Sequence, residues 1–282
     1  MRGRATAPAA GTVLNALATG RGSAFAIDIY TTATVELDDR NEVIGEIASA
    51  PDGDTRLIER CVSAVTEQFG AREGGTVRTE SDVPMAAGLK SSSAAANAVV
   101  LATLDALGVT DVSREDAARI GVTAAREVGV TVTGAFDDAS ASMLGGVTVT
   151  DNEQDELLAH DTVDWDVLVW TPPERAYSAD ADVSACKRIA PLAEVVEDLA
   201  LAGNYEQAMT VNGLAFCAAL GFSPDPMVAA MPDAAGVSLS GTGPSFTAVG
   251  DEDALARVRE RWHEYDGELI MTQTQTDGAY IV

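Results

Sequence analysis

Residues 84–96 (PMAAGLKSSSAAA) combine residue types that bind phosphate. Gly88 permits backbone close to a ligand, Lys90 adds a cation, and three serines lead directly into an alanine-rich segment. The start of a helix leaves several N–H groups unpaired and carries about half a positive charge. We therefore expect a phosphate site here, with the serine hydroxyls and Lys90 as further donors. Serines that only cap the helix are the simpler alternative. The segment is not a Walker loop, because GxxxxGK[ST] does not occur in the chain.

A second segment, residues 134–146 (GAFDDASASMLGG), places two adjacent carboxylates among small and apolar residues. At a cleft, Asp137 or Asp138 could accept the proton of an alcohol nucleophile, with a pKa tuned by its surroundings. Glu127 could add a carboxylate to a Mg²⁺ shell, since this ion is usually held by one or two carboxylates plus substrate phosphates. The alternative is that one of the aspartates only caps the following helix.

A third segment, residues 239–246 (LSGTGPSF), alternates glycines with hydroxyl residues between two expected strands. Its amides could face a ligand, or it could be an ordinary glycine-rich hairpin.

The elements that would position these segments alternate between strands and helices, without a strict βαβ repeat. We expect strands over residues 24–37, 42–48, 76–79, 166–170, 237–239, 246–249 and 268–272, with 42–48 pairing with 24–37 as a hairpin. We expect helices over residues 55–69, 92–107, 113–128, 185–202, 205–220 and 253–262. The acidic residues 151–164 are expected to form a surface link. This pattern predicts an α+β protein of two lobes.

The charge of the chain excludes some classes of partner. Acidic residues outnumber basic ones by 44 to 18, for a formal net charge of −26, which disfavours binding to nucleic acid or anionic membranes. Only Lys90 and Lys187 are lysines. We interpret this composition as adaptation to a salt-accumulating cell, because the Debye length is only about 3 Å at 1 M salt. An ordinary acidic cytosolic protein is the alternative.

Other features predict a cytoplasmic protein. No long apolar run predicts a membrane span, and the first ten residues do not resemble a signal peptide. The three cysteines and two histidines are far apart, so we expect neither a disulfide framework nor structural zinc.

Together the segments resemble the motifs of the GHMP small-molecule kinases, which include galactokinases, homoserine kinases and mevalonate kinases. PMAAGLKSSSAA resembles the second motif, PxxxGLGSSAA, and GAFDDASASMLGG is similar to the segment that carries the catalytic aspartate. SGTGPSF resembles a shortened third motif, and residues 7–15 (APAAGTVLN) resemble the first, APxxxxL. Within the family, these segments are most similar to those of the archaeal shikimate kinases.

The resemblance implies a two-lobed fold with the active site in the cleft between the lobes. It implies an N-terminal domain over residues 1–155, with the phosphate loop and the catalytic aspartate, and a ferredoxin-like C-terminal domain over 156–282. The implied reaction is ATP- and Mg²⁺-dependent phosphorylation of the 3-hydroxyl of shikimate, in aromatic amino acid biosynthesis. A homodimer is compatible with the sequence, which leaves the oligomeric state open.

The resemblance also assigns roles to single residues. Counting back from the Gly-Gly pair makes Asp138 the catalytic aspartate, with Lys90 as a second catalytic residue. The residues implied to bind ATP are Pro84, Gly88, Leu89, Lys90, Ser91, Ser92, Ser93 and Ala94. Those implied to bind magnesium are Ser92 and Glu127. Those expected to bind substrate are Asn15, Arg21, Asp28, Asp138, Gly241 and Thr242.

Two departures from the family pattern leave alternatives open. Ala9 and Ala10 stand where mevalonate-type members carry a lysine, and Lys90 replaces a glycine of the second motif. Lys90 or Arg21 would then supply the missing positive charge. Phosphorylation of homoserine, mevalonate or another small alcohol, or a catalytically inactive ligand-binding relative, are the alternatives.

Overall fold

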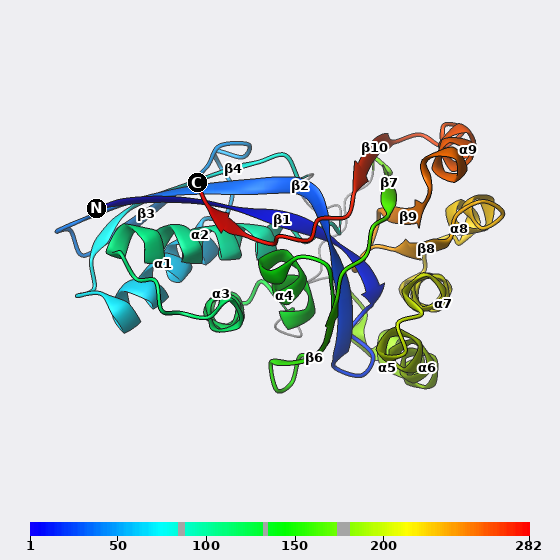
Figure 1. Cartoon of the computed structure of the whole chain (residues 1–282), viewed down its shortest axis with the longest axis horizontal. Helices are drawn as coiled ribbons and strands as arrows, with labels where there is room; N and C mark the ends of the chain where they lie inside the picture. The colour runs from blue at the N-terminus through cyan, green and yellow to red at the C-terminus, as the bar shows by residue number, and fades with distance from the viewer. Residues whose placement is uncertain (84–87, 132–134, 174–180) are drawn as a thin grey trace.

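The computed structural model describes residues 1–83, 88–131, 135–173 and 181–282 (Figure 1). In these ranges the chain forms two sheets with helices packed on them. One sheet has seven strands in the order β11-β1-β2-β4-β3, with β5 and β6 branching from β2, and the other has four in the order β10-β7-β9-β8. The predicted α+β class is confirmed.

The longest strands build the larger sheet. β1 (Arg2–Leu14) is antiparallel to β2 (Arg21–Asp38). β2 then pairs with two strands, with β5 (Val147–Asp151) along its first residues and with β4 (Gly74–Ser81) along its last. β2 therefore connects β5, the strand that follows the aspartate segment, with β4 in the outer part of the sheet.

Three of the structural features expected from the sequence are wrong. β3 (Val43–Ile47) pairs in parallel with β4 and not as a hairpin with β2, because α1 (Arg56–Phe69) crosses over between β3 and β4. The expected surface link contains β6 (Glu156–Asp161), which pairs with β5. The expected helix over 185–202 is interrupted, with α5 (Val183–Arg188) and α6 (Ala190–Leu201) meeting at Ile189, just before the proline in the first turn of α6.

Helices α1, α2 (Ser91–Leu107), α3 (Arg114–Glu127) and α4 (Phe136–Leu144) lie together on one face of the larger sheet (Figure 1). The alanines of α2 let it approach the sheet closely. A Cβ on Gly3 of β1 would lie only 2.1 Å from the carbonyl oxygen of Ala102. This close packing fixes the second half of α2 against the sheet, and the three serines lie at the opposite end of the same helix.

The smaller sheet consists of β7 (Asp166–Thr171), β8 (Gly236–Leu239), β9 (Phe246–Gly250) and β10 (Glu268–Gln273). Three further helices accompany α5 and α6 in this half, namely α7 (Tyr205–Leu220), α8 (Asp225–Ala230) and α9 (Glu252–Trp262). Buried side chains such as Phe216, Met227 and Trp262 form its core. At the end of the chain, β11 (Tyr280–Ile281) returns to pair with β1. The division into domains at residue 155 stays a prediction. Across the ranges listed above, none of the helices combines the length and the apolar character that a membrane span requires.

Candidate active site

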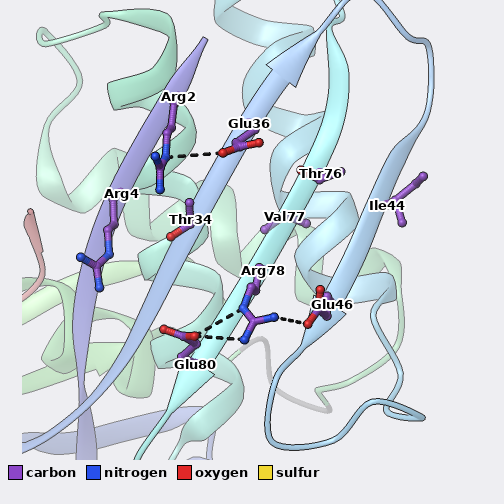
Figure 2. Close-up of a pocket in the computed structure, with 10 residues that line it drawn as sticks. All are labelled: Arg2, Arg4, Thr34, Glu36, Ile44, Glu46, Thr76, Val77, Arg78 and Glu80. Atoms are coloured by element: carbon purple, nitrogen blue, oxygen red, sulfur yellow. Dashed lines mark hydrogen bonds and ion pairs between the residues drawn. The ribbon is translucent and has the colours of Figure 1, made fainter.

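The three motif segments border a single cavity of about 490 Å³. Its lining includes Gly88 with Lys90, Ser91, Ser92 and Ser93, the pair Asp137 and Asp138, and Gly241 with Thr242. A second hollow, of about 520 Å³, lies on the open face of the larger sheet and is walled by ion pairs, Arg2 with Glu36 at 3.5 Å and Arg78 with Glu80 at 3.1 Å (Figure 2). None of the described motif residues lines the second hollow, whereas all three segments line the first, so we assign the candidate active site to the first.

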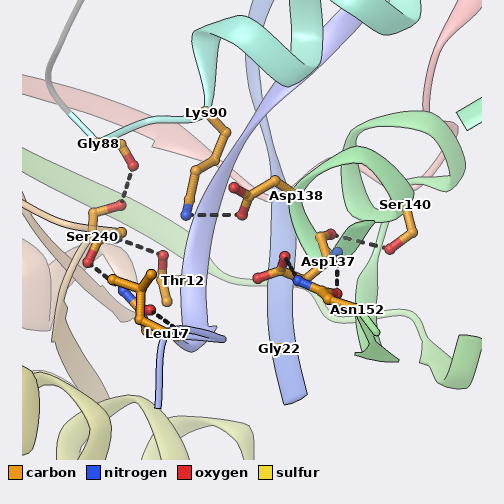
Figure 3. Close-up of polar contacts among 12 residues, drawn as sticks. Thr12, Leu17, Gly22, Gly88, Lys90, Asp137, Asp138, Ser140, Asn152 and Ser240 are labelled. Carbon is orange, nitrogen blue, oxygen red and sulfur yellow. Dashed lines mark hydrogen bonds and ion pairs between the residues drawn. The ribbon is translucent and has the colours of Figure 1, made fainter. Parts of the chain in front are cut away.

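The glycine-rich loop after β8 holds the phosphate segment in place. The Ser240 hydroxyl donates to the Gly88 carbonyl at 2.9 Å (Figure 3), and a Cβ on Gly88 would lie 2.2 Å from the Ser240 carbonyl oxygen. Gly88 has φ +76°, a left-handed conformation that glycine adopts without strain. Close approach and backbone conformation together require glycine at this position.

Residues 7–15 anchor the same loop from the other side. The Gly241 N–H donates to Thr12 Oγ1 at 2.8 Å, and Asn15 Nδ2 donates to the Gly241 carbonyl at 2.8 Å. Residues 7–15 and the phosphate segment are thus both connected by short hydrogen bonds to residues 240 and 241. The glycine-rich loop is part of the site and not merely a hairpin.

Lys90 is the N-cap of α2 and adopts the left-handed conformation, with φ +63°. Its side chain makes no cap hydrogen bond and lies in the cavity. The first N–H groups of a helix have no partner within it, so the amides of Ser91–Ser93 present donors and the positive end of the helix dipole. This arrangement suits an anion such as a phosphate chain.

The Lys90 ammonium faces Asp138 across the cavity (Figure 3). Lys90 Nζ lies 2.8 Å from Asp138 Oδ1, and the two side chains are only 10% and 13% exposed. A Cβ on Gly241 would lie 3.0 Å from Nζ, so a glycine there leaves room for the lysine. Among the residues that the structure describes, Oδ1 has no well-aligned hydrogen bond besides this ion pair. The Lys90 ammonium is therefore the partner of this buried oxygen, and both side chains belong to the lining of the cavity.

Burial sets the proton affinity of this carboxyl group. Loss of hydration, together with the nearby Asp137 charge, raises the pKa of Asp138 to about 7, against the lowering effect of Lys90. Burial alone would lower the pKa of Lys90, but Asp138 and Asp137 outweigh it and raise that pKa. Lys90 stays protonated at neutral pH, while Asp138 can gain and lose a proton.

Asp137 has different neighbours, which distinguishes it from Asp138. Its Oδ1 accepts a hydrogen bond from Asn152 Nδ2 at 2.7 Å, and it packs against Gly22, where a Cβ would lie 2.5 Å from its Cγ (Figure 3). Within the described ranges, Lys90 forms its ion pair with Asp138 and not with Asp137. The geometry favours Asp138 as the proton acceptor.

The predicted site residues divide into four groups. Those that line the cavity are Asn15, Gly88, Lys90, Ser91, Ser92, Ser93, Asp138, Gly241 and Thr242. Leu89 and Ala94 are buried beside it, at 1% and 0% exposure, so they support the loop from the core. Pro84 lies outside the described residues.

Three predicted ligands are not part of the cavity. Arg21 is bound elsewhere, with its guanidinium 2.6 Å from Asp151 and 3.6 Å from Glu197. Asp28 is exposed on β2 and does not line the cavity. Glu127 is exposed near the end of α3 and pairs with Arg60 at 2.5 Å. In this structure opposite charges or solvent hold Arg21, Asp28 and Glu127 away from the cavity, and the roles expected for them stay predictions.

Sequence reasoning missed the rest of the lining. One set is apolar and comes from the β3 end, α1, α3 and the residues after α3, namely Ile47, Leu57, Ile58, Val122, Ala125 and Val130. Another set carries hydroxyls on β2 and β4, namely Thr31, Thr79 and Ser81. Helical spacing did indicate Leu57 and Ile58, but only as core residues. Apolar walls with a few polar groups are typical of sites for ring-containing small molecules.

Comparisons with known proteins agree with this geometry. A family model described as "GHMP kinases N terminal domain" matches residues 56–146. A shikimate kinase of Halobacterium salinarum is 66% identical over 281 residues, covering 99% of both chains. A shikimate kinase of Methanosarcina mazei is 50% identical and covers 99% of this chain and 96% of that one.

Solved structures match the fold over the whole chain. A homoserine kinase from Cytophaga hutchinsonii superposes with a TM-score of 0.78 at 17% identity, covering 100% of this chain and 97% of that one. The mevalonate kinase of Methanococcus jannaschii gives a TM-score of 0.77 at 14% identity, with 98% of each chain covered. At such low identity these structures support the fold alone.

Proposed function

The chain belongs to the GHMP kinases, and we propose that it is a shikimate kinase, which transfers the γ-phosphoryl group of ATP to the 3-hydroxyl of shikimate. The single observation that carries the proposal is the Lys90–Asp138 pair at the starts of α2 and α4, inside a cavity bordered by all three motifs. The choice of alcohol rests on the 66% identity to a shikimate kinase over nearly the whole of both chains.

Asp138 acts on the hydroxyl of the substrate. The hydroxyl oxygen attacks the γ-phosphorus, the bond between that phosphorus and the bridging oxygen of ADP breaks, and the hydroxyl proton passes to Asp138. A carboxyl group with a pKa of about 7 is suited to this exchange near neutral pH. The aspartate receives the proton at Oδ1 or Oδ2 and returns it to solvent after product release.

Lys90 and the start of α2 bind the phosphate chain. Phosphoryl transfer depends mainly on positioning and charge neutralisation, and less on covalent chemistry by the protein. The ammonium neutralises charge on the transferred group, and the N–H groups of residues 91–93 bind phosphate oxygens. Lys90 lies in the second motif and takes the role of the lysine that the first motif lacks.

The donors of the cavity fit magnesium held mostly by phosphate oxygens and water. Ser92 contributes a hydroxyl oxygen, a hard donor of the kind that Mg²⁺ prefers. No cluster of three or more acidic, histidine or cysteine side chains suited to a metal exists in the described part of the chain. When bound, the ion would neutralise charge on the phosphates. Ser92 is our proposed protein ligand, while Glu127 is bound to Arg60.

Shikimate would bind on the Asp138 side of the cavity. Asn15, Gly241 and Thr242 also line the cavity, close to Lys90, and Asn15 and Gly241 are held in place by the hydrogen bonds around residue 241. The apolar residues Leu57, Ile58, Val122 and Val130 fit the adenine ring. With shikimate and the adenine ring bound in this way, the ATP phosphates would lie between them, beside Lys90.

A coupled assay of ADP release tests the proposal with shikimate, homoserine and mevalonate as separate acceptors, in KCl of about 1 M, where charge repulsion is screened. We expect turnover with shikimate and little with the other two alcohols. Faster turnover with another alcohol would assign a different substrate. Nucleotide binding by titration calorimetry without turnover on any acceptor would instead identify an inactive relative.

A further inference from the structure

Asn152 is a fully buried side chain whose contacts point to a role in the reaction. It follows β5 directly, is 1% exposed, and hydrogen-bonds Asp137 twice (Figure 3). Its Nδ2 donates to Asp137 Oδ1 at 2.7 Å, and its Oδ1 accepts the Asp137 N–H at 3.1 Å. The Thr150 hydroxyl also donates to Oδ1, at 2.7 Å, which fixes the amide orientation.

The contact with the Asp137 N–H replaces a missing helix cap. The N-cap residue of α4 is Ala135, which has no side-chain acceptor for the free N–H groups of the first turn. An asparagine from another element supplies that acceptor. The start of α4, and with it the backbone of both aspartates, is therefore fixed relative to β5.

The contact with the carboxylate fixes where Asp137 points. On its other side the carboxylate packs on Gly22 of β2, where a Cβ would lie 2.5 Å from Oδ2. Among the described residues that line the cavity, Lys90 is the only cation, and two neighbouring carboxylates lie within its electrostatic influence. An Asp137 released from Asn152 would compete with Asp138 for the ammonium.

We propose that Asn152 is a positioning residue for phosphoryl transfer, because it holds Asp137 away from Lys90 and so keeps Asp138 as the partner of the ammonium. The inference rests on the proposed kinase function. It predicts that the harm of losing Asn152 is caused by the Asp137 charge. Removing that charge should then restore activity.

Asn97 of α2 offers a matched control, because it contacts the same helix, α4. It is also buried, and its Nδ2 donates to the Ala139 carbonyl of α4 at 2.9 Å, but within the described residues it forms no hydrogen bond with either aspartate. Loss of Asn97 should weaken α4 without freeing a competing carboxylate. The two asparagines therefore separate a packing defect from a misplaced charge.

The test compares kcat and KM for Asn152→Ala, Asp137→Asn and the double variant, and for Asn97→Ala with and without Asp137→Asn. We expect Asn152→Ala to lower kcat about tenfold with little change in KM for shikimate, a coupling of ordinary size for contacting residues. In the double variant, kcat should return to within about twofold of that of Asp137→Asn alone. Asp137→Asn should not relieve any loss caused by Asn97→Ala.

Additive losses in the double variant, or normal kcat in Asn152→Ala, would overturn the positioning role. If Asn152→Ala does not fold, Asn152→Asp keeps the acceptor for the helix start while it removes the donor to Asp137, and the same rescue by Asp137→Asn is expected. The wild-type protein tests the proposed function separately. The ratios between variants can be measured with whichever alcohol the wild type phosphorylates.

Discussion

Replacing Lys90 by methionine tests the charge arrangement of the cavity most sharply. Methionine keeps much of the length and removes the ammonium that lies 2.8 Å from Asp138. At an effective dielectric constant of about 20, two unit charges 2.8 Å apart attract by about 6 kcal/mol, which is an upper limit for the loss. Removal of one preorganised donor from a transition state costs about 2.7–4 kcal/mol. We therefore expect kcat to fall by about 10²–10³.

The same substitution should shift the pH dependence. Lys90 lowers the pKa of Asp138 from an even higher value to about 7, so its loss should move the acid limb of the kcat profile to higher pH. The assay is ADP release at saturating ATP and shikimate, measured across neutral pH. Lys187→Met is the matched control, because it makes the same change at an exposed position on α5, away from the cavity.

A kcat for Lys90→Met within about threefold of that of the wild type would refute this reasoning, since about 0.7 kcal/mol is too little for a buried transition-state cation. An unshifted acid limb together with a large loss of kcat would also count against it. In that case Lys90 would bind phosphate without influencing the proton acceptor.

Three further outcomes are expected. Asp138→Asn should lower kcat by about 10²–10⁴ while the circular dichroism spectrum stays that of the wild type, and near-normal turnover would reject Asp138 as the proton acceptor. Glu127→Gln should change the Mg²⁺ concentration for half-maximal activity by less than about twofold, because the exposed carboxylate already pairs with Arg60; a rise of about tenfold or more would restore the magnesium role expected from the sequence. The melting temperature should rise from low salt to about 1 M KCl, because a formal net charge of −26 repels itself less when screened; an unchanged or falling value in differential scanning calorimetry would contradict salt adaptation.

The features that could be predicted from the sequence are those that depend on neighbours along the chain. The predicted helix over 205–220 has the observed bounds of α7, where periodic apolar residues end at Gly221. The predicted helix over 92–107 begins one residue late, because the N-cap of α2 is Lys90 in a left-handed conformation and not a serine. The phosphate segment and the aspartate pair could also be singled out from the sequence, because each is a short run of neighbouring residues.

The features that were missed depend on residues far apart in sequence. Glu127 has the expected spacing from Asp138, but Arg60, 67 residues before Glu127, pairs with its carboxylate. Asn152 occurs in an acidic stretch that looked like a surface link, and only the pairing of β5 with β2 and β6 places it beside Asp137. The parallel pairing of β3 likewise follows from a crossover helix, which no residue within β3 could reveal.

The most direct test of the central claim is to identify the product itself. Phosphorus-31 NMR of a reaction containing the protein, ATP, Mg²⁺ and shikimate would show whether the phosphoryl group is transferred to a hydroxyl of the shikimate ring. We predict one new phosphomonoester signal coupled to the ring proton at carbon 3, growing in step with ADP. Free inorganic phosphate alone, or an ester at another hydroxyl, would contradict the account.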